Sequence, residues 1–308
     1  MGLVFHNGRF IPEQNIQKSD DEARVLRLLR SFLDANEPGL VRFLVRIWND
    51  QGKAITYKEL REAILAGDID PQWMDDWMQD YSRFVKKYLQ PSWEKAIAAA
   101  VEELERRYPT WYFDPMGDGV RSWAATHAAE FVTNVTTTQI EGIRAVVQRA
   151  AVLEDMSVDE LARAIRPTVG LTKQQATANM NYYTTMREKG LSEKQALDKA
   201  QRYAAKQHRY RGYNIARTEL ATAYNTGAYE GTKQAQAAGL IGEVEKVWCT
   251  ADDERVCPIC GAIEGKTVEM DAEFEGISRS WSTHLTAPAH PGCRCAILYK
   301  EVQKPTPK

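Results

Sequence analysis

The chain has 308 residues, of which 44% are hydrophobic and 27% are charged, and its formal net charge at pH 7 is -2. This composition is typical of a globular protein with enough chain for two domains, or for one domain with a long extension. The near-neutral charge excludes a protein that coats DNA through overall basicity, although it is compatible with a local basic patch. No apolar run reaches the roughly 20 residues that cross a bilayer, and the N-terminus lacks the pattern of a secretory signal. We therefore expect no membrane anchor.

Capping residues and helical periodicity predict helices in the first part of the chain. Ser19, followed by acidic residues, is typical of a helix start, and apolar residues then recur at helical spacing. The "EPGL" run at 37–40 predicts a break or a kink in this helix. Thr56 and Glu59 form a capping box for a second helix, which should end at Gly67.

A third helix, which begins near Asp70, carries an aromatic stripe. Its rings recur at steps of three and four residues, at Trp73, Trp77, Tyr81, Phe84 and Tyr88. Such a stripe could stack on nucleic-acid bases or form a core between helices. Acidic residues rather than arginines lie between the rings, which favours the core.

Residues 108–119, "YPTWYFDPMGDG", have two prolines, two glycines and no period, and they predict a boundary or a long loop. A long helix is expected from about 120 to 152, although the run "TNVTTT" within it has weak helix propensity. Three capping boxes predict further helices at about 157–166, 172–188 and 192–208, and a fourth is expected at about 209–238.

The sequence changes character after Gly239. The segments "EVEKVWCT", "KTVEM" and "CAILYK" predict short strands among loops. The expected fold class is mainly α: an elongated helical N-terminal and middle region, followed by a small zinc-stapled, β-rich C-terminal module. The expected divisions are an N-terminal helical region at 1–117, a helical core at 118–239, the module at 240–300 and a disordered tail at 301–308.

Four of the five cysteines and one of the five histidines lie in "CPIC", at 257–260, and "HPGCRC", at 290–295. Two such spacings together predict a Zn²⁺ site, with a disulfide or buried free thiols as the alternative. The candidate ligands are Cys257, Cys260, His290, Cys293 and Cys295. Zinc takes four ligands, so one of the five is spare. Cys257 and Cys260 are expected as the first pair, whereas the second pair is open. The fifth cysteine, Cys249, is expected in the core.

A structural role is expected for this zinc, because a corner rich in thiolates closes the coordination shell and a module of about 60 residues has a small core. A catalytic zinc would need an open position and a nearby base, and Asp252, Asp253, Glu254 and His284 are the candidates. We expect no catalytic residue, no enzymatic activity and no small-molecule substrate.

The run "WCTADDERVCPICGAIEG" from Trp248, followed by "PAHPGCRCAIL" from Pro288, resembles the C-terminal signature of the phage Mu F-like minor head proteins, also called phage head morphogenesis proteins. The helix "IARTELATAYNTG", at 215–227, is similar to the helix that precedes this signature. The resemblance covers about residues 155–300. Within the two motifs, the residues expected at structural or interface positions are Arg217, Thr218, Glu219, Trp248, Asp252 and Arg294.

The resemblance implies a structural protein of the virion, located in the capsid interior or at the portal vertex and present in the host cytoplasm during assembly. Its implied partners are the portal protein, the major capsid protein or the scaffold protein. It also implies a role in head assembly and a contact with DNA during packaging or delivery.

Charge is unevenly distributed in the last third of the chain. Residues 201–238 contain six Lys or Arg (202, 206, 209, 211, 217 and 233) and two Glu, whereas residues 243–279 contain ten acids and four bases. This asymmetry predicts a polar contact of the helix with the module or with a partner. Arg217 and Glu219 are expected to form an ion-pair clamp between helix and module, and a solvated helix face is the alternative.

Two other functions fit the residues. One is a zinc-dependent nucleic-acid-binding protein or nuclease, which would need a basic groove near the zinc; the acid-rich 243–279 segment argues against a groove there. The other is a helical scaffold with a zinc knob that acts outside any virus.

Overall fold

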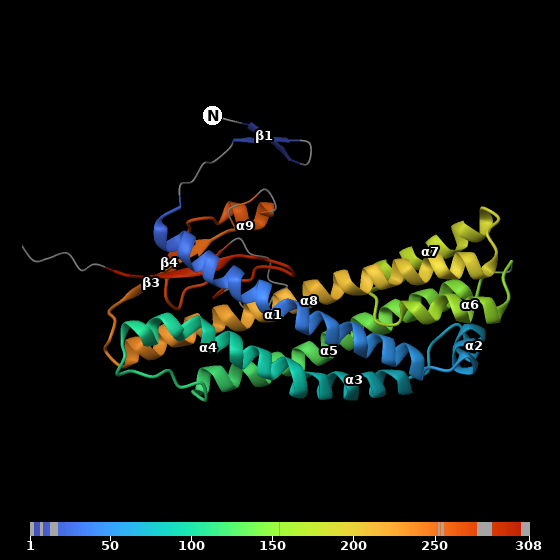
Figure 1. Ribbon diagram of the computed structural model, residues 1–308, viewed down its shortest axis with the longest axis horizontal. Coiled ribbons are helices and arrows are strands. Elements are labelled where there is room, and N and C mark those ends of the chain that lie inside the picture. The colour runs from blue at the N-terminus through green and yellow to red at the C-terminus, as the bar shows by residue number, and fades with distance from the viewer. Residues whose placement is uncertain are drawn as a thin grey trace, which may run out of the picture.

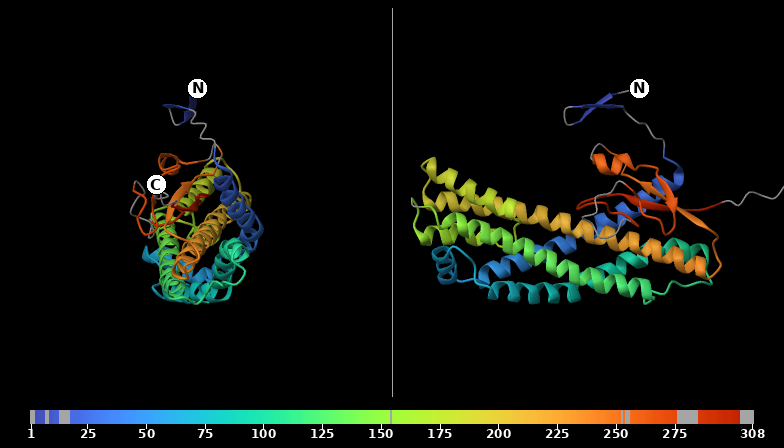
Figure 2. Two further views of the ribbon diagram at one scale, coloured as in Figure 1. Left: turned by 90° about the vertical axis from the view of Figure 1, so that its left-hand side faces the viewer. Right: turned by 180° about the vertical axis from the view of Figure 1, so that it is seen from behind.

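The computed structural model describes residues 3–6, 9–12, 18–153, 155–251, 253, 256–275 and 285–302. An elongated body of helices carries a small β-rich module near one end (Figure 1). The view from behind shows the module beside the C-terminal half of the longest helix (Figure 2). The mainly helical fold with a small β module is therefore confirmed.

The body contains eight α-helices among the described residues. They are α1 (Asp20–Ala54), α2 (Tyr57–Ala66), α3 (Gln72–Phe84), α4 (Gln90–Arg107), α5 (Asp118–Ala150), α6 (Val158–Ile165), α7 (Lys173–Glu188) and α8 (Glu193–Ala237). A π-helical turn at Val85–Leu89 joins α3 to α4, and a 3₁₀ turn at Arg166–Thr168 follows α6. None of the described helices combines the length and the apolarity that a bilayer-spanning helix needs.

Local capping signals predicted most helix starts. Complete capping boxes are present at Ser19, Thr56, Thr172 and Ser192. At Ser157 the hydroxyl accepts a hydrogen bond from the backbone of Glu160, but the Glu160 carboxylate accepts from Arg187 and Tyr183 instead of closing the box. The predicted long helix is also confirmed as α5, and the predicted loop lies between α4 and α5.

Of the two predicted alternatives at 37–40, the break is wrong, because α1 continues through Pro38, and the kink stays a prediction. Pro38 lacks the N–H that would bond one turn back. The residues around it nevertheless lie on one buried face, at Leu33, Glu37, Leu40 and Leu44. Packing of this face against the rest of the body outweighs the lost hydrogen bond.

The predicted division of 192–208 from 209–238 is also wrong, since both segments belong to the single 45-residue helix α8. Gly212, near the expected junction, lies against α1: a Cβ there would meet Val41 Cγ1 at 3.4 Å. This glycine allows two helices to approach each other and does not end one of them.

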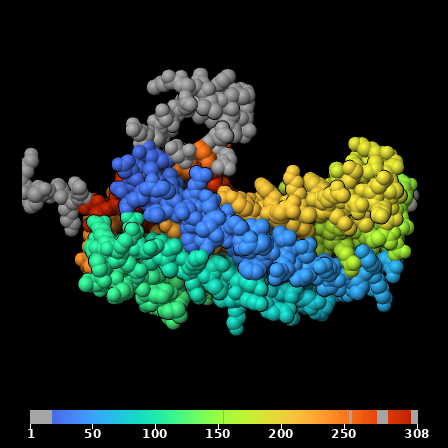
Figure 3. Space-filling view, viewed as in Figure 1, coloured from blue at the N-terminus to red at the C-terminus, as the bar shows by residue number. Residues whose placement is uncertain are grey.

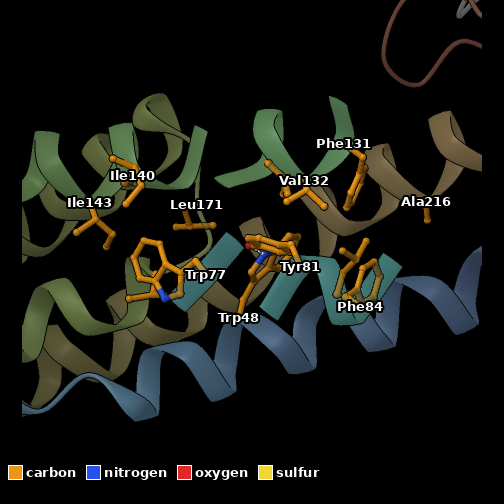
Figure 4. Close-up of a cluster of buried hydrophobic side chains, with 14 of the residues drawn as sticks. Trp48, Trp77, Tyr81, Phe84, Phe131, Val132, Ile140, Ile143, Leu171 and Ala216 are labelled. Carbon is orange, nitrogen blue, oxygen red and sulfur yellow. Dashed lines mark hydrogen bonds between the residues drawn. The ribbon is translucent and has the colours of Figure 1, made fainter. Parts of the chain in front are cut away.

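One hydrophobic core extends through the body. Its buried members include Phe113 and Val120, which flank the expected boundary after residue 117, so the two expected helical regions share this core. Figure 4 shows the middle of the core, where Trp48 Nε1 donates to the Tyr81 hydroxyl at 2.8 Å. Four rings of the aromatic stripe are buried, at Trp73, Trp77, Tyr81 and Phe84. The interpretation of the stripe as a core is confirmed.

The module contains one antiparallel sheet with the order β4-β3-β5. The strands are β3 (Val244–Cys249), β4 (Thr267–Glu269) and β5 (Ala296–Glu301), as the sequence predicted. The described N-terminal residues form a separate hairpin of β1 (Leu3–His6) and β2 (Arg9–Pro12). Of the predicted tail, Glu301 ends β5, whereas 303–308 lie outside the described residues.

The two faces of the sheet have different neighbours. Val247, Cys249 and Leu298 lie in a cluster with Val25 and Leu26 of α1. Trp248 and Ile297 belong to a second cluster, which contains three cysteines of the two motifs. This alternation is the two-residue period of a strand, and it places the cysteine motifs on the side of the sheet that faces away from these α1 residues. The expected core position of Cys249 is confirmed, and burial raises the pKa of its thiol to about 12.

A first prediction concerns the approach of α4 to α8. A Cβ at Gly227 would lie 2.6 Å from Ile97 Cα, an atom of the α4 backbone that cannot rotate away. Gly227→Ala should therefore lower the free energy of unfolding by about 2 to 4 kcal/mol, as overpacking and displaced helices do. Urea unfolding followed by circular dichroism measures the effect.

Gly39 of α1 is the matched control, since a Cβ there would meet only Arg42 Nη2, at 4.0 Å. Gly39→Ala should stabilise the chain by about 0.5 to 1 kcal/mol through helix propensity alone. Equal effects of the two substitutions would contradict the close approach at Gly227.

Candidate metal centre

The first pair of candidate ligands lies at the start of a short helix, α9 (Pro258–Ala262). Cys257 is its N-cap residue, and the Cys257 sulfur accepts a hydrogen bond from the backbone N–H of Cys260 at 3.3 Å. Pro258 occupies the first helical position, where a missing N–H has no cost. The turn therefore brings the Cys257 and Cys260 side chains to one side and directs a backbone dipole at one sulfur.

The second group comes from the loop that leads into β5. The N–H of Cys293 donates to the carbonyl of His290 at 3.1 Å, and Gly292 has φ +71° within this turn. A left-handed conformation of this kind favours glycine. The turn places His290 and Cys293 beside α9, and Cys295 immediately precedes the strand.

The five residues form two overlapping groups that could hold a metal ion. One group is Cys257, Cys260 and His290, and the other is Cys260, Cys293 and Cys295. His290 Nε2 lies 3.1 Å from Cys257 Sγ and 3.3 Å from Cys260 Sγ, and Cys260 Sγ lies 3.7 Å from Cys293 Sγ. Two sulfurs on one tetrahedral zinc are about 3.8 Å apart. The donor types and the Cys260–Cys293 distance suit such an ion, and each of the two groups supplies three ligand atoms.

Cys260 belongs to both groups, so it would be a ligand whichever group held an ion. A cavity of ≈ 20 Å³ is lined by all five candidates. The Nδ1 atom of His290 lies 2.9 Å from the Pro291 carbonyl. A proton on Nδ1 would donate to that carbonyl and leave Nε2 as the metal-binding nitrogen. The choice of four ligands out of five stays a prediction.

The clustered thiols differ in pKa. Hydrogen bonds from Cys260 and Cys295 lower the pKa of Cys293, whereas the hydrogen bond with Cys293 raises the pKa of Cys260. Among Cys260, Cys293 and Cys295, the lowered pKa therefore belongs to Cys293, and the pKa values of the other two are raised. Metal binding would displace the remaining thiol protons, so affinity should increase with pH.

Apolar residues enclose the ligands. Trp248 is fully buried, and its ring meets that of Phe274 edge-on at a centroid distance of 5.1 Å. Both rings share a cluster with Cys260, Cys293 and Cys295. This surrounding layer buries the side chains of Cys260, Cys293 and Cys295, which suits an ion that supports the fold, whereas Cys257 and His290 are half-buried.

Arg294 lies between two candidate ligands and points away from them. Its guanidinium forms two hydrogen bonds with the Asp253 carboxylate, one of them 2.6 Å long. This pair ties the loop before α9 to the loop before β5. Asp252 lies outside the described residues, as do Glu254 and His284, the other residues considered as a catalytic base.

The expected ion-pair clamp between α8 and the module is wrong. Arg217 binds Glu37 of α1 through hydrogen bonds of 2.7 and 3.0 Å, and Glu219 lies 2.8 Å from His127 Nε2 of α5. Successive helical residues point about 100° apart, so these two charges face other helices of the body. The Arg217 and Glu37 side chains are only 12% and 2% exposed, which makes the pair internal.

Thr218, which lies between Arg217 and Glu219 in the sequence, makes the contact between α8 and the module. The N–H of Gly292 donates to the Thr218 hydroxyl at 2.9 Å, beside His290 and Cys293. Two further contacts follow on the same side of α8: the N–H of Ile297 donates to Asn225 Oδ1 at 3.3 Å, and the Tyr229 hydroxyl donates to Asp271 at 2.6 Å.

The basic helix and the acidic module do form a polar contact, but it lies at another part of α8 than the expected Arg217 and Glu219. Lys233 lies 3.3 Å from Asp271, close to the C-terminal end of α8. Asn225 and Tyr229 were missed as contact residues. Their signal was the recurrence of polar residues at 218, 225, 229 and 233, which lie on one helical face.

A model of the family described as Phage Mu protein F like protein matches residues 141–298. The match extends from the last part of α5 to β5 and contains every candidate metal ligand. No curated protein and no solved structure gives a significant match.

The ligand assignment predicts metal loss on substitution of the shared cysteine. Cys260→Ser should abolish stoichiometric zinc binding and unfold the module while the helical body stays folded, because metal binding and local folding are coupled in small sites. Mass spectrometry gives the metal content, and hydrogen exchange reports on the two regions separately. Cys249→Ala is the matched control and should retain its zinc; full zinc retention in Cys260→Ser would contradict the assignment.

A third prediction concerns the attachment of the module. Thr218→Val removes the acceptor for the Gly292 N–H and should weaken the attachment by about 1 kcal/mol. Faster hydrogen exchange at 285–302 measures the effect. Thr222→Val is the control, because its hydroxyl, like that of Thr218, donates one turn back along the helix. Comparable exchange in the two variants would argue against an anchoring role for Thr218.

Proposed function

The chain belongs to the phage Mu protein F like family, and from this membership we propose that it is a minor head protein of a tailed phage. In this role it binds at the portal vertex or in the capsid interior and takes part in head assembly. The observation that carries the proposal is the family match over 141–298, which unites the second half of the body with the module.

The proposed role is structural and non-enzymatic. The body is a rod of helices with one continuous core, and the module is attached to it by side-chain contacts from α8. We propose a structural Zn²⁺ held by four of the five clustered ligands, bound in the reducing cytoplasm of the host. Asp253, an acid near the cluster, is engaged by Arg294, which suits a structural corner better than a general base.

The proposed first partner is the portal protein, with the major capsid and scaffold proteins as further contacts. The exposed faces of the rod offer a long surface for such binding (Figure 1). The nuclease alternative would require cleavage activity dependent on the metal cluster.

The test uses the phage that encodes the chain. A tagged copy should co-sediment with assembled heads and retain portal protein in a pull-down, and the Cys260→Ser variant should do so poorly because its module is unfolded. Absence from purified heads together with no portal binding would overturn the proposal. Divalent-dependent plasmid cleavage that is lost in a folded His290→Ala variant would favour the nuclease instead.

A further inference from the structure

The first half of α8 carries a basic stripe on its open side. Its members are separated by three, four, three and four residues, and all are exposed: Lys199, Arg202, Lys206, Arg209 and Tyr213. With a rise of 1.5 Å per residue the stripe is about 21 Å long. We refer to these five residues as the α8 basic stripe. Tyr210 lies beside it and is 64% exposed.

The four bases of the α8 basic stripe have no carboxylate within ion-pair distance among the described residues, whereas Arg217 and Lys233, later in the same helix, both have one. A single exposed acid, Asp198, lies within residues 194–213 of α8. The charge of the stripe is therefore not neutralised by the protein itself.

The stripe continues into a cavity of ≈ 420 Å³ between α1 and the module. Tyr213 belongs to both, and the cations that line the cavity are Lys18, Arg27, Arg30, Arg217 and Arg294. Asp34 and Asp253 also line it, and Lys18, Arg30, Arg217 and Arg294 are paired with acids. Arg27 is exposed and has no ion pair among the described residues, so it extends the positive surface onto α1. Arg30 is also exposed, but it lies 3.7 Å from the Asp34 carboxylate. Figure 3 shows α1 and the first half of α8 side by side on this face.

We propose that the α8 basic stripe, together with Arg27, binds the sugar–phosphate backbone of duplex DNA. Duplex DNA presents one negative charge per about 1.7 Å of its axis, so a straight row of cations can meet several phosphates at once. The stripe contains no aliphatic side chain, whereas protein interfaces are depleted of lysine and have an apolar centre. Interfaces with DNA are more polar and positively charged. This chemistry favours nucleic acid over an acidic protein segment.

The contact would be independent of sequence and sensitive to salt. The stripe residues are long side chains on one helix and reach phosphates without a groove-reading element. With a net charge of -2 the molecule as a whole does not attract DNA, so attraction requires a local patch such as this one. The contact is additional to the proposed portal or capsid binding and does not depend on it.

The test measures binding of the full chain to a mixed-sequence duplex of about 30 base pairs by fluorescence anisotropy, from about 50 to 200 mM salt. The stripe variant carries Lys199→Gln, Arg202→Gln, Lys206→Gln and Arg209→Gln. The slope of its log affinity against log salt concentration should be less negative by about 3 to 4, because each lost phosphate contact changes the slope by about 0.9. Affinity at about 100 mM salt should decrease by roughly a hundredfold or more.

The control variant carries the same change of charge at exposed positions of other helices: Lys86→Gln, Lys87→Gln, Arg106→Gln and Arg149→Gln. It should keep the wild-type slope, and both variants should keep wild-type circular dichroism and zinc content. Unchanged binding in the stripe variant, equal losses in both variants, or no binding by the wild type at the lowest salt would each overturn the proposal. So would displacement by polyglutamate at lower concentration than by DNA, since an acidic polypeptide would then be the partner.

A portal pull-down with the stripe variant separates this proposal from the structural role. Retained portal binding with lost DNA binding supports an independent DNA surface. Loss of both in a folded variant would overturn it, because the stripe would then be part of the portal contact.

Discussion

The structure depends on the burial of α8 from several sides at once. Ten consecutive residues, 218–227, are buried, so this part of the helix is surrounded and has no solvent face. Glycines allow the neighbours to approach closely: Gly227 lies against the backbone of α4, and Gly212 against α1. The module completes the enclosure through Thr218 and Asn225. The body and the module are therefore held in register by one helix, and the same helix leaves its first half open.

Three of the candidate metal ligands are also members of the small hydrophobic core of the module. Cys260, Cys293 and Cys295 lie in the same buried cluster as Trp248 and Phe274. An ion bound there would add coordination bonds where the apolar contacts are few, which is how small domains compensate for limited burial. The helical body has its own extended core and does not need that support. Stability should therefore be divided unevenly between the two parts, with the ion affecting mainly the module.

Sequence patterns predicted the features that are fixed locally. Capping boxes predicted the helix starts, and the cysteine spacing predicted the cluster of candidate metal ligands. The aromatic stripe with Trp73 and Tyr81 predicted which face of its helix is buried. Sequence patterns failed where the structure depends on contacts between residues that are far apart in the chain. Pro38 remains helical because its neighbours are buried, and α8 continues through Gly212, which lies against α1. The partners of Arg217 and Glu219 depend on the positions of α1 and α5, which periodicity does not provide. The fourth ligand also depends on fine loop geometry.

The bond of Arg217 with Glu37 joins residues that are 180 positions apart in the chain. A ribosome that adds about 5 to 20 residues per second needs about 10 to 40 s to make the second partner after the first. During that interval the acid-bearing face of α1 has no cation to meet, and its leucines have no α8 to cover them. The order of synthesis therefore leaves the nascent N-terminal helices with an exposed apolar face. A chain of this design has to delay its collapse, or have that face shielded, until its longest helix emerges.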